Sequence, residues 1–325
     1  MPEIKISEKQ LACIRAKRHK PHKDCGISLF QSQILKWYKK NKRDNLPWRF
    51  TPQRPIGAYE ILISEIMLQQ TQVPRVLDMF PKFLAAFPTT RHLAEAPLDT
   101  VLKEWQGMGY NRRALYLKRS TQEVMKKFGG HIPSDTTLLE TLPGIGPYTS
   151  GAISCFAFNM PAVFLDTNIR KFFIHYFFPH GRDNKKISDA DILPIAERLL
   201  YKKNPRIWNY ALMDYGALIL SRKPELLSRA KNYHKQSPFL GSSRFFRSQI
   251  IQYLLKHKQA PFDELQKISP YNIKPILASL CREGLIKEIQ PDIFAIASLS
   301  FPRRRESREP KHRKYENLPY AASHD

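Results

Sequence analysis

The sequence lacks any long hydrophobic run, has few acidic residues for its size and holds only four cysteines. No stretch approaches the roughly 20 consecutive apolar residues that a transmembrane helix needs. The basic start, MPEIKISEKQLACIRAKRHK, also lacks the unbroken apolar stretch of a secretory signal peptide. A cytoplasmic protein without membrane attachment is therefore expected.

The cysteines predict neither a disulfide framework nor a metal site. Cys13, Cys25, Cys155 and Cys281 are far apart and match no spacing of metal ligands. We interpret them as free thiols in a reducing compartment, with Cys155 buried.

The shortage of acidic residues leaves a large positive charge. Lysine and arginine number 53 against 29 aspartate and glutamate residues, for a formal net charge of +24. Such an excess attracts polyanions and releases counterions when it binds nucleic acid. Anionic membrane surfaces would also be attracted, but a nucleic acid is the favoured partner.

Helical periodicity dominates what is present. We see no alternating strand pattern before about residue 284, so a mainly α fold is predicted. Glycine and proline residues separate the successive helices. The predicted helices are 28–43, 59–70, 72–87, 98–106, 111–128, 135–141, 147–158, 188–202, 205–220 and 244–257.

The pattern divides the chain into five segments. Residues 1–28 form a basic, partly helical arm, and residues 29–220 form the helical body. A polar linker occupies 221–243. Residues 244–300 combine three helices with a hairpin made of GLIKEI and IFAIA, which is typical of a winged-helix-like module. The charged tail 301–325 has no apolar face and is expected to be disordered.

One carboxylate lies on an apolar helix face. Within helix 59–70, Glu65 shares its face with four mostly apolar neighbours: Ile61, Leu62, Leu68 and Gln69. Their bulk withdraws the carboxylate from water, which raises its pKa and favours the protonated form. A carboxylic acid protonated near neutral pH is what general-acid catalysis needs. The alternative is a core glutamate bonded to a nearby backbone or hydroxyl group.

A glycine-rich turn separates two predicted helices in the run LPGIGPYTSGAI, residues 142–153. The glycines permit a tight reversal, and the first amides of the next helix are unpaired and partly positive. Such a turn binds phosphate through its backbone. An ordinary turn between helices is the alternative. The predicted DNA contacts here are Gly144, Ile145, Gly146 and Thr149.

Five motifs in order resemble the helix-hairpin-helix DNA glycosylase superfamily (HhH-GPD), and within it the adenine glycosylases of the MutY type. They are LPWR at 46–49, SEIMLQQTQV at 64–73, WQGMGYNRRA at 105–114, LPGIGPYTSGAI at 142–153 and LDTNIRKF at 165–172. The resemblance covers about residues 30–220. It implies a glycosylase domain of two helical lobes over the body.

The resemblance implies a role for each matching residue. Glu65 stands where the family keeps the general acid that protonates the departing adenine, and Asp166 where it keeps the aspartate that stabilises the sugar cation. Gln70, with Gln69 before it, matches the residue that wedges into the base stack after flipping. The positions that match the base pocket are Trp48, Arg49 and Leu68.

The chemistry agrees with these roles. Cleavage of an N-glycosidic bond needs a protonated leaving group and a fixed negative charge beside the developing sugar cation. Glu65 suits the acid. Asp166 is followed by Thr167 and Asn168, whose polar groups are expected to help keep it ionised. The target base lies inside the stack, so base flipping is implied.

Tyr148 predicts a monofunctional enzyme and is counted with the catalytic residues. The resemblance implies that strand-nicking relatives carry a lysine at this position, and no lysine occurs between Lys127 and Lys171. An abasic site is the expected product.

Three departures from the family pattern matter. Residues 213–237 contain no cysteine where many members hold a [4Fe–4S] cluster, so that cluster is predicted absent. The winged-helix-like module stands in place of a larger domain that reads 8-oxoguanine. Thr167 and Asn111 stand where the family pattern has a glycine and a tyrosine.

The resemblance also implies a monovalent cation bound by hairpin carbonyls.

The favoured function is removal of adenine mispaired with 8-oxoguanine or guanine in double-stranded DNA, by a monomer associated with the nucleoid. A thymine or uracil mismatch glycosylase is the close alternative. A bifunctional lyase and a non-catalytic DNA-binding protein on this scaffold stay open.

Overall fold

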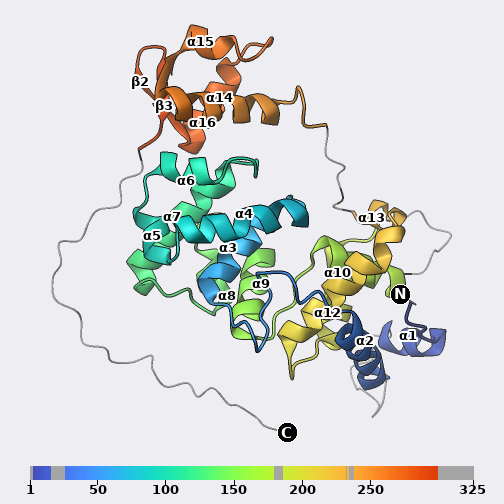
Figure 1. Cartoon of the computed structure of the whole chain (residues 1–325). Coiled ribbons are helices and arrows are strands. Elements are labelled where there is room, and N and C mark those ends of the chain that lie inside the picture. The colour runs from blue at the N-terminus through green and yellow to red at the C-terminus, as the bar shows by residue number, and fades with distance from the viewer. Residues whose placement is uncertain (1–2, 16–25, 179–185, 232, 234–237, 299–325) are drawn as a thin grey trace, which may run out of the picture.

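The computed structural model describes residues 3–15, 26–178, 186–231, 233 and 238–298, and these fold into two helical lobes and a smaller C-terminal module (Figure 1). The predicted tail 301–325 and Cys25 lie outside the described residues. The two lobes confirm the fold expected from the motifs.

The first lobe is continuous in sequence and surrounds one buried helix. Helix α3 (Ala58–Leu68) has buried residues on every side, including Ile61, Met67 and Glu65, because it runs through the centre of this lobe. The helices around it are α4 (Val73–Ala86), α5 (Thr90–Glu95), α6 (Leu98–Glu104), α7 (Arg112–Phe128), α8 (Thr136–Glu140) and α9 (Pro147–Phe158).

The second lobe joins the beginning of the chain to its middle. Its helices are α1 (Glu8–Arg15), α2 (Ile27–Asn41), α10 (Thr167–Phe177), α11 (Asp189–Leu199), α12 (Pro205–Leu218), the short 3₁₀ turn η1 (Leu220–Arg222) and α13 (Glu225–Ser228). Phe30 of α2 is fully buried among the rings of Phe172, Phe177 and Trp208. These aromatic contacts fix α2 against α10 and α12.

Two of the predicted segments pack against the second lobe. The proposed linker at 221–243 is not free along its first half, because α13 buries Leu226 and the backbone of Ile187 pairs with that of Ala230. The N-terminal arm is partly helical, as predicted, but its described part is docked. The amide of Ile4 donates to Tyr215 Oη at 2.9 Å, and Leu11 is buried.

The C-terminal module has the winged-helix arrangement, with one strand that the pattern missed. Its elements are α14 (Ser243–His257), β1 (Gln259–Pro261), α15 (Phe262–Gln266), α16 (Lys274–Glu283), β2 (Ile286–Gln290) and β3 (Ile293–Ile296). The three strands form an antiparallel sheet in the order β1-β3-β2. The prediction of no strand before residue 284 is therefore wrong for β1, whose three residues are too few to alternate.

The module contacts the first lobe next to α6 and α7 (Figure 1). The Arg244 guanidinium donates to Tyr110 Oη at 2.5 Å, and Lys258 Nζ lies 3.8 Å from Asp99 Oδ2. Among the described residues, no helix is both long and apolar enough to cross a membrane.

Candidate active site

Glu65 is a buried acid in the middle of α3. Only 4% of its surface is exposed. The pKa of Glu65 is raised to about 7, chiefly by burial and to a smaller extent by the negative charge of the nearby Asp166. A hydrogen bond from Tyr148 and the charge of Arg49 act in the opposite direction. The acid is therefore close to half protonated near neutral pH, as its apolar helix face predicts.

Tyr148 reaches Glu65 from the start of α9. Its hydroxyl donates to Glu65 Oε2 at 3.2 Å, although the two residues are 83 positions apart in the chain. Burial raises the pKa of Tyr148 well above its ordinary value, so the phenol stays neutral and acts as a donor. The ring of Tyr148 also packs edge-on against Phe164.

Asp166 is the N-cap residue of α10, and its carboxylate bonds to the first turn. Oδ1 accepts from the amide of Ile169 at 2.6 Å, and Oδ2 accepts from Asn168 Nδ2 at 3.1 Å. These bonds lower the pKa of Asp166, as its polar neighbours predict. Burial outweighs them, so the net pKa of Asp166 is raised above its ordinary value.

Gly216 lets α12 pack closely against the first turn of α10, next to Asp166. A Cβ atom built on Gly216 would stand 2.3 Å from the carbonyl oxygen of Asn168, closer than real contacts allow. Only glycine therefore lets α12 cross the first turn of α10 at this distance. The position of Asp166 depends on this crossing.

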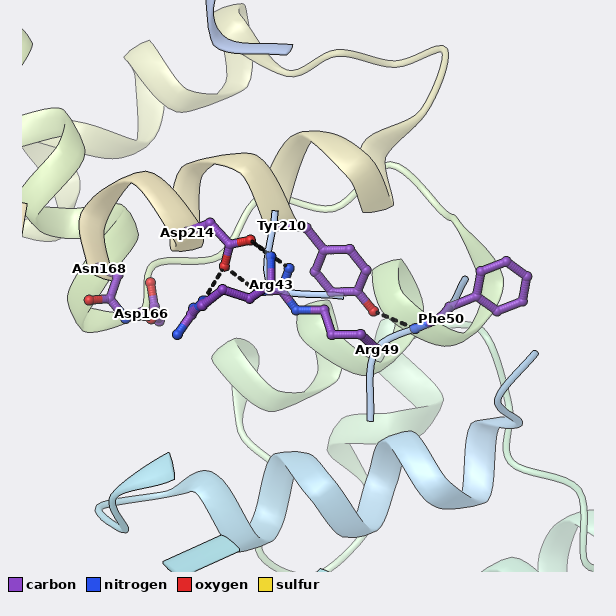
Figure 2. Close-up of polar contacts among 7 residues, drawn as sticks. All are labelled: Arg43, Arg49, Phe50, Asp166, Asn168, Tyr210 and Asp214. Carbon is purple, nitrogen blue, oxygen red and sulfur yellow. Dashed lines mark hydrogen bonds and ion pairs between the residues drawn. The ribbon is translucent and has the colours of Figure 1, made fainter. Parts of the chain in front are cut away.

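A buried ion cluster lies beside Asp166, and the sequence did not predict it. Figure 2 shows Asp214 on α12 between Arg43 and Arg49, with Asp166 close by. Asp214 accepts from Arg49 at 2.6 and 3.1 Å, and from the Arg43 side chain and amide at 2.6 and 3.0 Å. Asp214 is fully buried, and two guanidinium groups compensate its charge.

Arg49 connects this cluster to the acid. Its guanidinium lies 4.2 Å from the centre of the Tyr210 ring, and its charge lowers the pKa of Glu65. Arg49 is thus in the site, as predicted, but in this structure its donors are directed to Asp214. The sequence signal for this cluster is the run DYGA at 214–217, inside the stretch that the sequence marks only by its lack of cysteine.

Of the other two residues predicted for the base pocket, one precedes α3 in the chain and one ends it. Trp48 is buried edge-on against Phe80, and Leu68 is the partly buried last residue of α3. Gln69 and Gln70 form the turn that follows. Gln69 Nε2 donates to Thr149 Oγ1 at 3.2 Å, and Gln70 is exposed with a φ of 55°.

The glycine-rich turn joins α8 to α9 as a helix-hairpin-helix. Gly144 has a φ of +79° and lies against Tyr116, where a Cβ would come within 2.8 Å. The side chains of Ile145 and Thr149 are buried, so only their backbone can meet a phosphate. Gly146 is the N-cap residue of α9, whose first amides have no acceptor within the helix.

The described cysteines do not fit a metal cluster. Cys155 is buried on α9, and burial raises the pKa of its thiol to about 12, while Cys13 and Cys281 lie on α1 and α16. Across the described ranges, no three His, Cys, Asp or Glu side chains gather in a group suited to a metal ion.

The fold and site together define a helix-hairpin-helix protein whose two lobes hold a buried acid beside a second carboxylate. Comparison with known proteins agrees. The family model described as "HhH-GPD superfamily base excision DNA repair protein" matches residues 63–197. An adenine DNA glycosylase of Mycolicibacterium smegmatis is 30% identical over 291 residues, which cover 83% of this chain and 97% of that protein. The chain belongs to the HhH-GPD superfamily of base excision DNA repair proteins.

Other relatives are similar over a little less than two thirds or about two thirds of the chain. The adenine DNA glycosylases of Buchnera aphidicola (from Acyrthosiphon pisum) and Homo sapiens are 36% and 31% identical over 61% and 66% of this chain. The chain spans only 55% and 42% of these two proteins. A solved thermostable thymine-DNA glycosylase is 26% identical with a TM-score of 0.52, covering 63% of this chain and 92% of that one.

Proposed function

We propose that the protein is a monofunctional DNA glycosylase that hydrolyses the N-glycosidic bond of adenine mispaired with 8-oxoguanine or guanine. The observation that carries this proposal is the pairing of Glu65, with a pKa of about 7, and Asp166 at the junction of the two lobes. The adenine DNA glycosylases similar to this chain support adenine as the base.

The reaction follows from the two carboxyl groups. Protonated Glu65 donates its proton to the ring of the flipped base, and the electron pair of the C1′–N bond leaves with the base. Ionised Asp166 stabilises the positive charge that develops on the sugar. Water then adds to C1′ and loses a proton, which leaves free adenine and an abasic site. Tyr148 orients Glu65 through its hydrogen bond.

Several further features belong to the proposal. Tyr148 occupies the position of a strand-nicking lysine, which supports a monofunctional reaction. The four dispersed cysteines support the absence of a [4Fe–4S] cluster. The net charge of +24 supports duplex DNA as the partner. A monomeric state, a cytoplasmic location and a monovalent cation at the hairpin stay predictions.

A thymine or uracil mismatch glycosylase is the second candidate. The 26% identity and TM-score of 0.52 to a thymine-DNA glycosylase favour it. Glu65 favours adenine, because a purine leaving group gains from ring protonation by a buried acid.

Single-turnover base release separates the two. Duplexes would contain A opposite 8-oxoguanine, A opposite G, T opposite G, or U opposite G. We expect adenine release from the first two, and a loss of about 100-fold or more in E65Q and D166N. Release of thymine or uracil alone would support the second candidate. No release from any duplex, with binding intact, would contradict both.

A further inference from the structure

A cavity of about 720 Å³ lies between the first lobe and the winged-helix module. The turn Gln69–Gln70 and the loop 107–113 line one side, and Phe239 and α14 line the other. Sites for small organic ligands typically measure roughly 300–1,000 Å³, so a single nucleotide fits.

The Gln69–Gln70 turn separates this cavity from the acid. Gln69 follows Glu65 by four residues, an axial distance of about 6 Å on a helix. The left-handed backbone of Gln70 is held in place by Arg113, whose Nη1 donates to the Gln69 carbonyl at 2.6 Å and whose Nη2 donates to the Met108 carbonyl at 3.0 Å. The turn therefore stands, with a well-held backbone, between the cavity and the site of Glu65.

The cavity wall suits a nucleobase. Gln249 and Gln252 are three residues apart on α14, so they share one helix face, and both are partly buried. Each amide offers a donor and an acceptor, which is how glutamine reads the edge of a base. Tyr110 and Phe239 add aromatic surface on which a base can stack.

The charges around the cavity suit the nucleotide backbone. Arg112 is exposed at the rim, where it can meet a phosphate. The one acidic lining residue, Glu283, is neutralised by Arg247 at 2.6 Å. The bond from Arg244 to Tyr110 links α14 to the first lobe and so joins the two walls of the cavity.

We propose that this cavity receives the nucleotide that faces the flipped base, and that Gln249 and Gln252 select which opposite base is accepted. This proposal rests on base flipping in the proposed function. A flipped base leaves its partner without hydrogen bonds, and burying that polar edge unpaired is costly. The two amides replace the lost bonds for one base better than for the others.

Equilibrium binding tests this without any cleavage. Duplexes would carry a tetrahydrofuran abasic analogue at the target position, opposite 8-oxoguanine, G, C or T. For the wild type we expect Kd values that differ by about tenfold or more between the best and worst opposite base. In the double variant Q249A/Q252A the spread shrinks to about twofold. The control Q290A, an exposed glutamine of the same module outside the cavity, keeps the wild-type spread.

The outcomes distinguish this proposal from the glycosylase activity. Equal wild-type affinity for all four duplexes would overturn it, and so would a double variant that weakens all four by the same factor. Because the target position carries no base, these results do not depend on whether adenine is the base released. Circular dichroism of the double variant would confirm that the module is still folded.

Discussion

Glu65 shows how a single residue can serve both burial and chemistry. The same apolar contacts that bury α3 raise the pKa of Glu65 to about 7, while Tyr148 and Arg49 limit the rise. A fully apolar site would keep the proton at all pH values and would transfer it poorly. The hydrogen bond from Tyr148 therefore adjusts the acid to the pH at which it works.

Removing the Tyr148 hydroxyl should shift the pH profile upward. In the wild type, the rate of base release depends on protonated Glu65, so it should fall above about pH 7, by about tenfold per pH unit. In Y148F the carboxylate loses a donor that stabilises its ionised form, so the pKa of Glu65 rises and the rate falls only at higher pH. Single-turnover rates between pH 5 and 9 would show the shift.

A matched control exists in the winged-helix module. Y253F also removes a hydrogen bond from a tyrosine to a glutamate, at 2.9 Å to Glu264, but far from the acid. Its profile should coincide with that of the wild type. A downward shift in Y148F, or equal shifts in both variants, would contradict the role assigned to Tyr148.

Single residues differed in how well the sequence predicted them. Glu65 was found because its own helix supplies the apolar neighbours. The ion cluster was not, because Arg43 and Asp214 are 171 positions apart and no local pattern links them. The burial that raises the pKa of Asp166 was not predicted either, because its polar sequence neighbours give no sign of it.

At the scale of elements, the helices that were missed differ in how visible they are in the sequence. Helix α10 has a polar face of Thr167, Lys171 and His175 opposite buried residues such as Phe172 and Phe173, so its period is present and was overlooked. Helix α5 has six residues, too few for a period to appear. The strongly amphipathic α4 and α7 were predicted to within one residue at every end.

The crossing of α10 and α12 should not tolerate a side chain at Gly216. In G216A the new Cβ meets backbone atoms of Asn168 at 2.3 and 2.7 Å, so one helix must move. We expect a loss of about 1–3 kcal/mol in the free energy of unfolding. The rate of base release should also fall, because Asp166 moves with α10.

Urea titration and single-turnover kinetics would measure the two effects. In the control G57A the new Cβ meets only the flexible end of Glu60, at a backbone position without positive φ. Its cost should therefore be limited to that of a weaker N-cap on α3, and its rate of base release should stay near that of the wild type. Wild-type stability and rate in G216A would contradict the tight crossing.

Helices α5 and α7 are joined by a buried lysine whose charge is costly. Lys118 is fully buried, its Nζ donates to the Ala94 carbonyl at 2.8 Å, and burial lowers its pKa to about 8. Between about pH 8 and the ordinary lysine pKa of about 10.4, the unfolded chain binds this proton and the folded protein does not. The folded state therefore gains stability from this group as pH rises through that window.

The variant K118M cannot titrate at this position and isolates the effect. The free energy of unfolding of the wild type should rise relative to that of K118M between pH 7 and pH 10, as measured in urea. Gln122 also donates to the Ala94 carbonyl, at 3.3 Å, so the variant keeps a donor there. Parallel pH dependences would show that Lys118 keeps its proton throughout.

For the whole molecule, the excess of positive charge should appear as a salt dependence of DNA binding. Each phosphate contact releases a counterion, so the logarithm of the affinity falls linearly with the logarithm of salt concentration. Replacing exposed Arg112 with alanine should reduce that slope by about one. R91A removes a charge that is already paired with Glu95 on α5, so its slope should match the wild type. An unchanged slope in R112A would show that Arg112 makes no phosphate contact.

The second lobe has a consequence for biosynthesis. Helices α1 and α2 leave the ribosome before α10 and α12, yet apolar side chains of α2, such as Phe30 and Trp37, pack on Phe172 and Tyr215, which are made much later. The first lobe, by contrast, is one uninterrupted stretch and can close as soon as it emerges. During translation the hydrophobic face of α2 therefore stays exposed until α10 and α12 have been synthesised. Nascent chains that stall between these points are the ones we expect chaperones to hold.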